Sequence, residues 1–158
     1  MRRSCLLRDL KGCPVSEMTV SDLAKKMKDI DFALFSTRTD GGLIASRPMS
    51  NNGDVEYDGD SWFFTYDQTR LVRDLTQDAH AQLGFTGDKS LLGKPGIFVS
   101  VQGEAELIRD KAQFEAHWTS ELERWFPDGI DTPGIVLIRV HATRITYWDG
   151  EEQGEIRV

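Results

Sequence analysis

Two short segments of the chain combine arginine with features that suit an anionic ligand. In the first, Ser46-Arg47-Pro48-Met49, the proline marks a strand end, an edge or a bulge, because proline cannot donate to a hydrogen-bond ladder. Backbone groups beside it would be free to meet a ligand, and the guanidinium of Arg47 is a fork suited to phosphate. An exposed arginine beside a strand-breaking proline explains the same residues, so this segment alone does not indicate a site.

The second segment is a hydrophobic strand that runs directly into the start of a helix. Such a junction points unpaired amides and the positive end of the helix dipole at the loop, which suits an anion. Thr65 and Thr69 offer hydroxyl groups there, and Arg70 falls in the first helical turn, where the dipole disfavours a cation. An anion facing Arg70 would explain its position. An ordinary capped helix, with Arg70 paired to Asp67 or Asp74, explains it equally well.

Aromatic residues stand at two further element ends. Trp125-Phe126-Pro127 ends the longest expected helix, and Tyr147-Trp148 closes the last expected strand. Flat side chains near a phosphate site would be able to flank a planar heterocycle. Packing in the core is the commoner role for each of them taken singly.

Other kinds of chemistry are not indicated. The sequence has no glycine-rich dinucleotide motif and no G-x-S-x-G nucleophile motif. His80, His117 and His141 fall in different expected elements without ligand spacing, which weakens a metal-site interpretation. Cys5 and Cys13 match neither a C-x-x-C redox pair nor a zinc half-site, so we expect two reduced thiols.

Charge and hydropathy narrow the class of protein. The 158 residues include 19 Lys and Arg against 26 Asp and Glu, a formal net charge of −7. This acidity argues against a nucleic-acid binder and against a peripheral protein of anionic membranes, since both need a positive field. No apolar run approaches the roughly 20 residues of a membrane helix, and the run near the start is too short for a signal peptide. We therefore expect a cytoplasmic protein.

Periodicity and turn signals predict a mainly β domain, a small antiparallel barrel with peripheral helices. Strands and helices do not alternate regularly, which disfavours a parallel sheet. We expect an N-terminal extension, flexible, over residues 1–18, one domain over 19–150, and a C-terminal tail over 151–158. Expected helices begin at Thr19, at about Thr69 and at Asp110, the last running to Trp125. Expected strands cover Phe32–Arg38, Leu43–Met49, Ser61–Tyr66, Ala79–Phe85, Ile97–Ile108, Ile135–Val140 and Thr143–Trp148.

Taken together, these segments resemble the flavin-binding split-barrel superfamily of pyridoxamine-phosphate-oxidase-like proteins, in particular its general stress protein 26 type. The resemblance spans about residues 20–150. It is carried, in order, by Arg47–Met49, Trp62–Thr65, Val99–Leu107, Trp125–Pro127 and Tyr147–Asp149. It implies a six-stranded antiparallel split barrel that forms a homodimer, with FMN in clefts at the subunit interface.

The resemblance also implies roles for individual residues. Arg47 and Arg70 would hold the flavin phosphate together with Thr65 and Thr69. The chain around Pro48 and Met49 would lie along the isoalloxazine edge. The remaining contacts would come from the backbone of Phe64 and Tyr66 and from Trp125 or Trp148, the tryptophan reaching over from the partner subunit.

One departure from the family pattern bears on activity. True pyridoxamine phosphate oxidases carry cationic substrate and flavin contacts at the positions of Gly154, Ile156 and Val158. We therefore expect an FMN-binding protein of the stress-protein type that does not oxidise pyridoxamine phosphate, with no catalytic acid or base marked by the sequence. It would be either a flavin-dependent oxidoreductase of unknown substrate or a non-catalytic flavin-binding or sensing module. The same fold holding a deazaflavin or haem is the third alternative.

Overall fold

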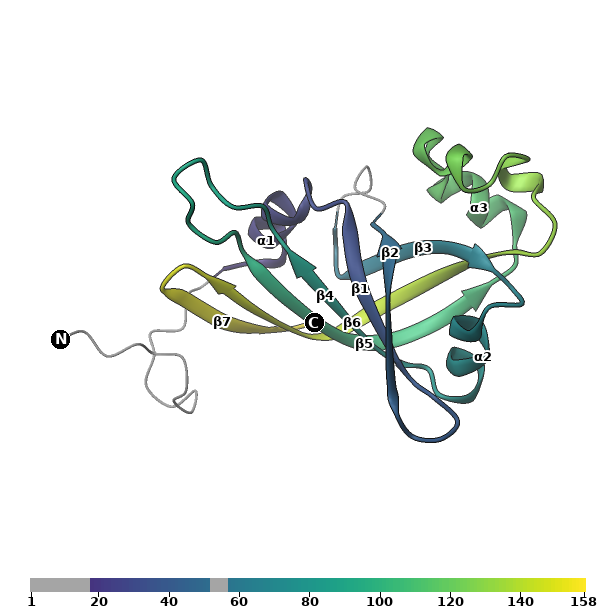
Figure 1. Cartoon of the computed structure of the whole chain (residues 1–158), viewed down its shortest axis with the longest axis horizontal. Helices are drawn as coiled ribbons and strands as arrows, with labels where there is room; N and C mark the ends of the chain where they lie inside the picture. The colour runs from purple at the N-terminus through teal and green to yellow at the C-terminus, as the bar shows by residue number, and fades with distance from the viewer. Residues whose placement is uncertain (1–17, 52–56) are drawn as a thin grey trace.

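The fold is built on one antiparallel sheet of seven strands, seen in a computed structural model that describes residues 18–51 and 57–158 (Figure 1). The strand order is β2-β1-β4-β5-β6-β3, and β7 pairs with β6 beside this path. The sheet stays open, with β2 and β3 at the two ends of the order. The strands are β1 Phe32–Arg38, β2 Ile44–Ser50, β3 Asp60–Tyr66, β4 His80–Thr86, β5 Phe98–Ile108, β6 Ile135–Asp149 and β7 Glu152–Arg157.

The core lies on the concave face of this curled sheet. Strands β1 and β3 are not neighbours in the sheet, yet the rings of Phe35 and Phe63 meet edge to face with centroids 5.3 Å apart. The sheet therefore curves until strands from distant positions share one core, as in a split barrel. On β5, Val99 and Val101 are buried while Gln102 and Glu104 are exposed. The alternation expected for this strand is confirmed, and so is the mainly β, antiparallel fold class.

The first two helices begin at the expected residues. Helix α1 (Val20–Met27) starts with a capping box in which Thr19 and Asp22 each accept a backbone N–H of the other. Helix α2 (Arg70–Gln77) is capped by Thr69, whose Oγ1 accepts the N–H of Val72 at 3.4 Å. Each helix buries its apolar face against the sheet. Among the described residues, no helix is long and apolar enough to cross a membrane.

The third helix is shorter than its periodicity predicts. In place of one helix from Asp110 to Trp125, the chain forms α3 (Lys111–His117), breaks at Trp118, and continues as two 3-10 segments, η1 (Ser120–Arg124) and η2 (Gly129–Asp131). The break lets Trp118 and Phe126 close around the ring of Phe64. Phe114 and Leu122 are buried as they would be on one continuous helix, so periodicity alone did not reveal the break, although Trp125, where that helix was expected to end, is 53% exposed.

The C-terminal half of the sheet also differs from expectation. The two strands expected over 135–140 and 143–148 form one strand, β6, with a register shift where Gln102 pairs with Arg144 and Gly103 with Ala142. The expected tail over 151–158 is wrong, because residues Glu152–Arg157 form β7 and pair with β6. The expected N-terminal extension lies, except for Met18, outside the described residues.

Candidate functional site

The candidate residues come mostly from the two end strands of the open sheet and from the helix that follows the second of them. Strand β2 carries three of them, β3 carries three more, and α2 with its cap carries two. Among the described residues β2 pairs only with β1, so one side of its backbone has no strand partner there. Pro48 therefore sits on an edge strand, one of the positions that the sequence indicated, where proline is tolerated.

Arg47 is held in place by two buried side chains. Its Nη1 donates to Oγ1 of Thr37 at 2.6 Å, and its Nη2 donates to Oδ2 of Asp74 at 3.2 Å. Thr37 also donates to the same Asp74 oxygen, at 2.8 Å. The Arg47 side chain is 21% exposed, so it is not the freely exposed arginine of the alternative interpretation. This contact links β2 to α2 and so joins the two groups of candidate residues.

Arg70 has a different environment. It lies at the first position of α2 and is exposed, and the first turn of α2 contains no acidic residue. Both carboxylates that the alternative interpretation paired with it are held by other arginines: Asp67 by Arg109, and Asp74 by Arg47. Within residues 18–51 and 57–158, no carboxylate lies at ion-pair distance from Arg70. In the part of the chain that the structure describes, a cation and the positive helix end therefore stand together without a paired carboxylate.

Neighbouring residues on the candidate strands point to opposite faces. Thr65 is buried and lies on the same face of β3 as Phe63, toward the main core. Phe64 faces the other way, into the second cluster around Phe114, Trp118 and Phe126. On β2, Met49 packs against the core. The side chain of Phe64 is therefore held in this cluster, so any contact from Phe64 to a ligand would come from its backbone.

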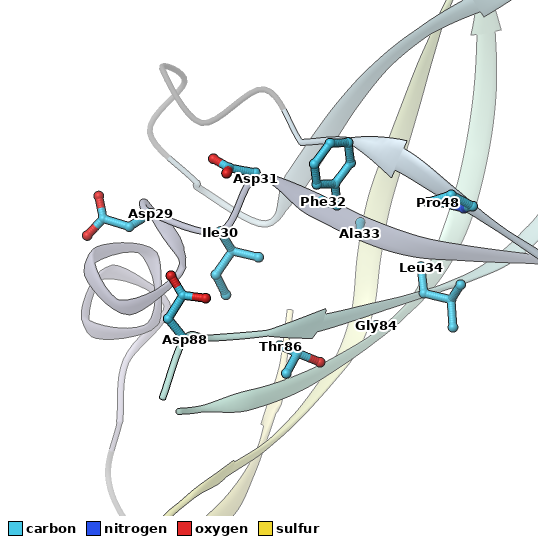
Figure 2. Close-up of a pocket in the computed structure, with 10 residues that line it drawn as sticks. All are labelled: Asp29, Ile30, Asp31, Phe32, Ala33, Leu34, Pro48, Gly84, Thr86 and Asp88. Carbon is cyan, nitrogen blue, oxygen red and sulfur yellow. The ribbon is translucent and has the colours of Figure 1, made fainter. Parts of the chain in front are cut away.

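Pro48, whose side chain projects from the opposite face of β2 to Met49, lines a pocket of about 380 Å³ (Figure 2). The pocket lies between β2, the start of β1 and the end of β4. A larger open groove of about 790 Å³ lies farther along the sheet, where His80 contacts Asp78 at 2.7 Å between ring nitrogen and carboxylate oxygen. Hydrogen bonds from His80 lower the pKa of Asp78. The sequence did not single out this pair.

The two candidate tryptophans lie at opposite ends of the molecule. Trp125 is 53% exposed, and its carbonyl oxygen accepts a hydrogen bond from the hydroxyl of Tyr66 at 3.2 Å, which brings it to the end of β3. Trp148 lies thirteen positions along β6 from Ile135, the register partner of Tyr66. That is about 40 Å of strand. One chain therefore brings Trp125 to the α2 region but does not bring Trp148 there.

The sequence did not assign Thr37 or Asp74 to Arg47, since it offered Asp74 only as a partner of Arg70, and it did not single out Phe98. Thr37 and Asp74, which hold Arg47, belong to elements far apart in the chain, and no local pattern marks them. Phe98 is 44% exposed and is the register partner of Trp148, so two aromatic residues occupy opposed positions on the outer face. The sequence did carry a signal for Phe98. It is an aromatic residue on the face of β5 that is otherwise polar, the same face as Ser100.

Solved structures of other proteins share this fold. A protein related to general stress protein 26 from Clostridium acetobutylicum is 21% identical, with 85% of this chain and 90% of that one covered and a TM-score of 0.72. The general stress FMN/FAD-binding protein of Xanthomonas citri is 22% identical, with 83% and 88% covered and a TM-score of 0.65. A haem-binding protein from Mycobacterium smegmatis is 15% identical, with 90% and 60% covered and a TM-score of 0.70.

Sequence comparison gives a consistent result. Protein bli-3 of Neurospora crassa is 25% identical over 140 residues, covering 83% of this chain and 65% of that protein, so the chain spans less than two thirds of its length. The profile described as "Pyridoxamine 5'-phosphate oxidase like" matches residues 18–158. Because that match covers the whole sheet together with α1, α2 and α3, the chain belongs to the pyridoxamine 5'-phosphate oxidase like family.

Proposed function

We propose that this protein binds FMN, with the flavin phosphate at the N-terminus of α2. The observation that carries the proposal is Arg70, a cation on a positive helix end whose neighbouring carboxylates are both held by other arginines. The amides of the first turn of α2 and the hydroxyls of Thr65 and Thr69 complete a donor set suited to phosphate. The Xanthomonas citri relative with this fold is named as binding FMN or FAD, which supports the choice of ligand.

Arg47 and β2 would form the other wall of the site. Asp74 and Thr37 fix the guanidinium of Arg47, so its remaining donors reach a ligand from one direction without reorganisation. The unpaired side of β2 near Pro48 offers backbone donors and acceptors to the edge of a planar ring. Bound flavin would supply hydride and electron transfer, while the chain supplies position and charge.

The second chain of a homodimer would complete this site. The outer face of the sheet exposes five large apolar side chains: Phe32 and Leu34 at 52% each, Ile44 at 69%, Phe98 at 44% and Trp148 at 39%. Strand register places all five on the same face. Exposed apolar side chains that share one face of a sheet indicate an interaction surface. A two-fold copy seated on this face would bury these five side chains against the same face of the other chain.

The chemistry that follows binding has two forms. We propose a flavin-dependent oxidoreductase of a substrate other than pyridoxamine phosphate, with a non-catalytic flavin-binding module as the alternative. The haem-binding neighbour from Mycobacterium smegmatis keeps haem as a second ligand to test. The absorption spectrum of the purified protein distinguishes flavin from deazaflavin and from haem. Consumption of reduced nicotinamide with an added electron acceptor distinguishes an enzyme from a binder.

The test of the phosphate site is a titration of FMN and riboflavin against wild type, Arg70→Ala and Arg73→Ala. Riboflavin has the same ring without the phosphate. A charge-assisted hydrogen bond is worth about 1.5–3 kcal/mol, so Arg70→Ala should weaken FMN binding by about ten- to a hundredfold and leave riboflavin nearly unchanged. Arg73→Ala removes the same charge from an exposed position of α2 beyond its first turn and serves as the control. Equal weakening of both flavins by Arg70→Ala would contradict the assignment.

A further inference from the structure

The loop between β4 and β5 (residues 87–97, the β4–β5 hairpin) carries two leucines at its tip. Both are fully exposed to solvent. Leu91 and Leu92 have relative exposures of 108% and 87% and lie at the corner of a tight turn. The turn is fixed by hydrogen bonds from Gly93 N to Ser90 O at 2.8 Å and from Ser90 N to Lys94 O at 2.9 Å. An ordered turn that presents two adjacent large apolar side chains is typical of a contact surface.

This hairpin tip is basic as well as apolar. Lys89 and Lys94 flank the two leucines, and both are exposed, on a chain whose formal net charge is −7. In the described part of the chain, neither lysine forms an ion pair. The tip therefore combines an apolar point with positive charge on either side of it.

The pocket beside β2 has the complementary character. Asp29, Asp31 and Asp88 stand at one end of it and Leu34 and Pro48 at the other (Figure 2). The apolar lining also includes Ile30 and Phe32. Across the described ranges, none of the three aspartates is in an ion pair, so the acidic rim has no internal cation. The volume of about 380 Å³ is sufficient for leucine side chains.

The pocket cannot take the tip of its own hairpin, because Asp88 lies at the base of that hairpin. The loop between β4 and β5 extends past the ends of its two strands (Figure 1), and Leu91 lies in it three residues beyond Asp88. Two copies of the hairpin lying antiparallel, side by side, would place each tip at the base of the other. A two-fold axis through the middle of the pair satisfies both pockets at once, which is the closed arrangement that a symmetric dimer requires.

We propose that the β4–β5 hairpin is a dimer clasp, in which Leu91 and Leu92 of one chain occupy the acidic-rimmed pocket of a second copy. Lys89 and Lys94 would lie against the aspartates of the rim. The pocket adjoins the exposed outer face of the sheet through Phe32, Leu34 and Pro48, so clasp and face form one continuous interface. The inference rests on the homodimer of the proposed function and adds the segment that holds it together.

Sedimentation equilibrium of the full chain tests the leucines. Leu91→Asp/Leu92→Asp places charge at the tip, opposite an acidic rim, and should raise the dimer dissociation constant by about thirtyfold or more. The control is Leu43→Asp, another exposed leucine (73%) at the β1–β2 turn, which should change the constant by less than about threefold. A Leu91→Asp/Leu92→Asp dimer as tight as wild type overturns the clasp and leaves the homodimer standing.

A charge exchange tests the pairing itself. Lys89→Asp/Lys94→Asp and Asp29→Lys/Asp31→Lys should each raise the dissociation constant by about tenfold or more, and their combination should return it to within about threefold of wild type. Failure of the combined variant to recover overturns the clasp. Monomeric wild type at micromolar concentration overturns both clasp and homodimer. Neither result bears on the phosphate site, which the flavin titration of Arg70→Ala reads separately.

Discussion

Replacing Arg47 by alanine should destabilise the fold, even in the absence of any ligand. The substitution removes the cation that contacts Asp74, a carboxylate whose side chain is 7% exposed, and the donor that contacts the buried hydroxyl of Thr37. Removing one partner of a buried ion pair typically costs about 3–5 kcal/mol. Two features reduce this figure. Thr37 continues to donate to Asp74, and the 21% exposure of Arg47 shows that water reaches the site.

We therefore expect a loss of about 2–3 kcal/mol in the free energy of unfolding. For a domain of this size the melting temperature should fall by roughly 5–10 °C. Thermal unfolding of the ligand-free protein, followed by circular dichroism, measures it. Arg70→Ala is the matched control: it removes an exposed arginine without a carboxylate partner in the described structure, and should melt within about 2 °C of wild type.

Arg47→Lys separates charge from geometry. Lysine keeps the positive charge but cannot present two parallel donors, so its melting temperature should fall between those of wild type and Arg47→Ala. The reasoning is refuted if Arg47→Ala melts within about 2 °C of wild type. That result would mean that the link between β2 and α2 contributes nothing to the stability of the ligand-free fold.

Three other expectations concern strand β7, the His117 ring at the end of α3, and the oxidation of pyridoxamine phosphate. Gly154→Ala should lower the melting temperature by about 3–10 °C, because the added Cβ would come within 2.3 Å of the buried Tyr147 hydroxyl. Gly41→Ala should change it little, because a Cβ there would meet only Oγ1 of Thr39, at an ordinary contact distance of 3.9 Å. Burial lowers the pKa of His117, whose ring stacks on Trp62 with centroids 3.6 Å apart. As the pH falls, the histidine of the unfolded chain therefore binds its proton at a higher pH than the histidine of the folded chain. The free energy of unfolding should fall as the pH drops below about 6.5. Urea titrations at pH 7 and pH 5.5 measure this dependence, and His117→Gln should flatten it. Finally, pyridoxamine phosphate should not be oxidised when FMN is added, since position 154 has no room for a cationic side chain; steady formation of pyridoxal phosphate would show otherwise.

Local signals in the sequence were enough for most of the sheet. The expected strand Phe32–Arg38 is confirmed with the same bounds, because its apolar run ends at a clear glycine turn. The capping threonines of α1 and α2 were readable for the same reason, since each lies directly before an apolar helical face. Strand β7 was missed because Glu152–Arg157 has little apolar alternation, and it forms only by pairing with β6.

The candidate site was predictable residue by residue but not as an arrangement. The sequence singled out Arg47 and Arg70 as similar cations. The structure separates them: Asp74, 27 residues from Arg47 in sequence, forms an ion pair with Arg47, while Arg70 has no carboxylate partner among the residues that the structure describes. Such a pairing depends on how α2 lies against β1 and β2, and no spacing within the chain encodes it. The roles of these residues in holding FMN stay predictions.

The unpaired side of β2 also bears on aggregation. An edge strand with a continuous row of free N–H and C=O groups is a template on which another extended chain can add, which is a common start of self-association. Pro48 lies near the middle of β2 and has no N–H to offer, so the row of donors is interrupted there. A long strand could not keep an unbroken ladder along this edge, whereas a small planar molecule needs only the two or three backbone groups on one side of the interruption. Leaving this edge open for a ligand thus does not leave it open to strand addition.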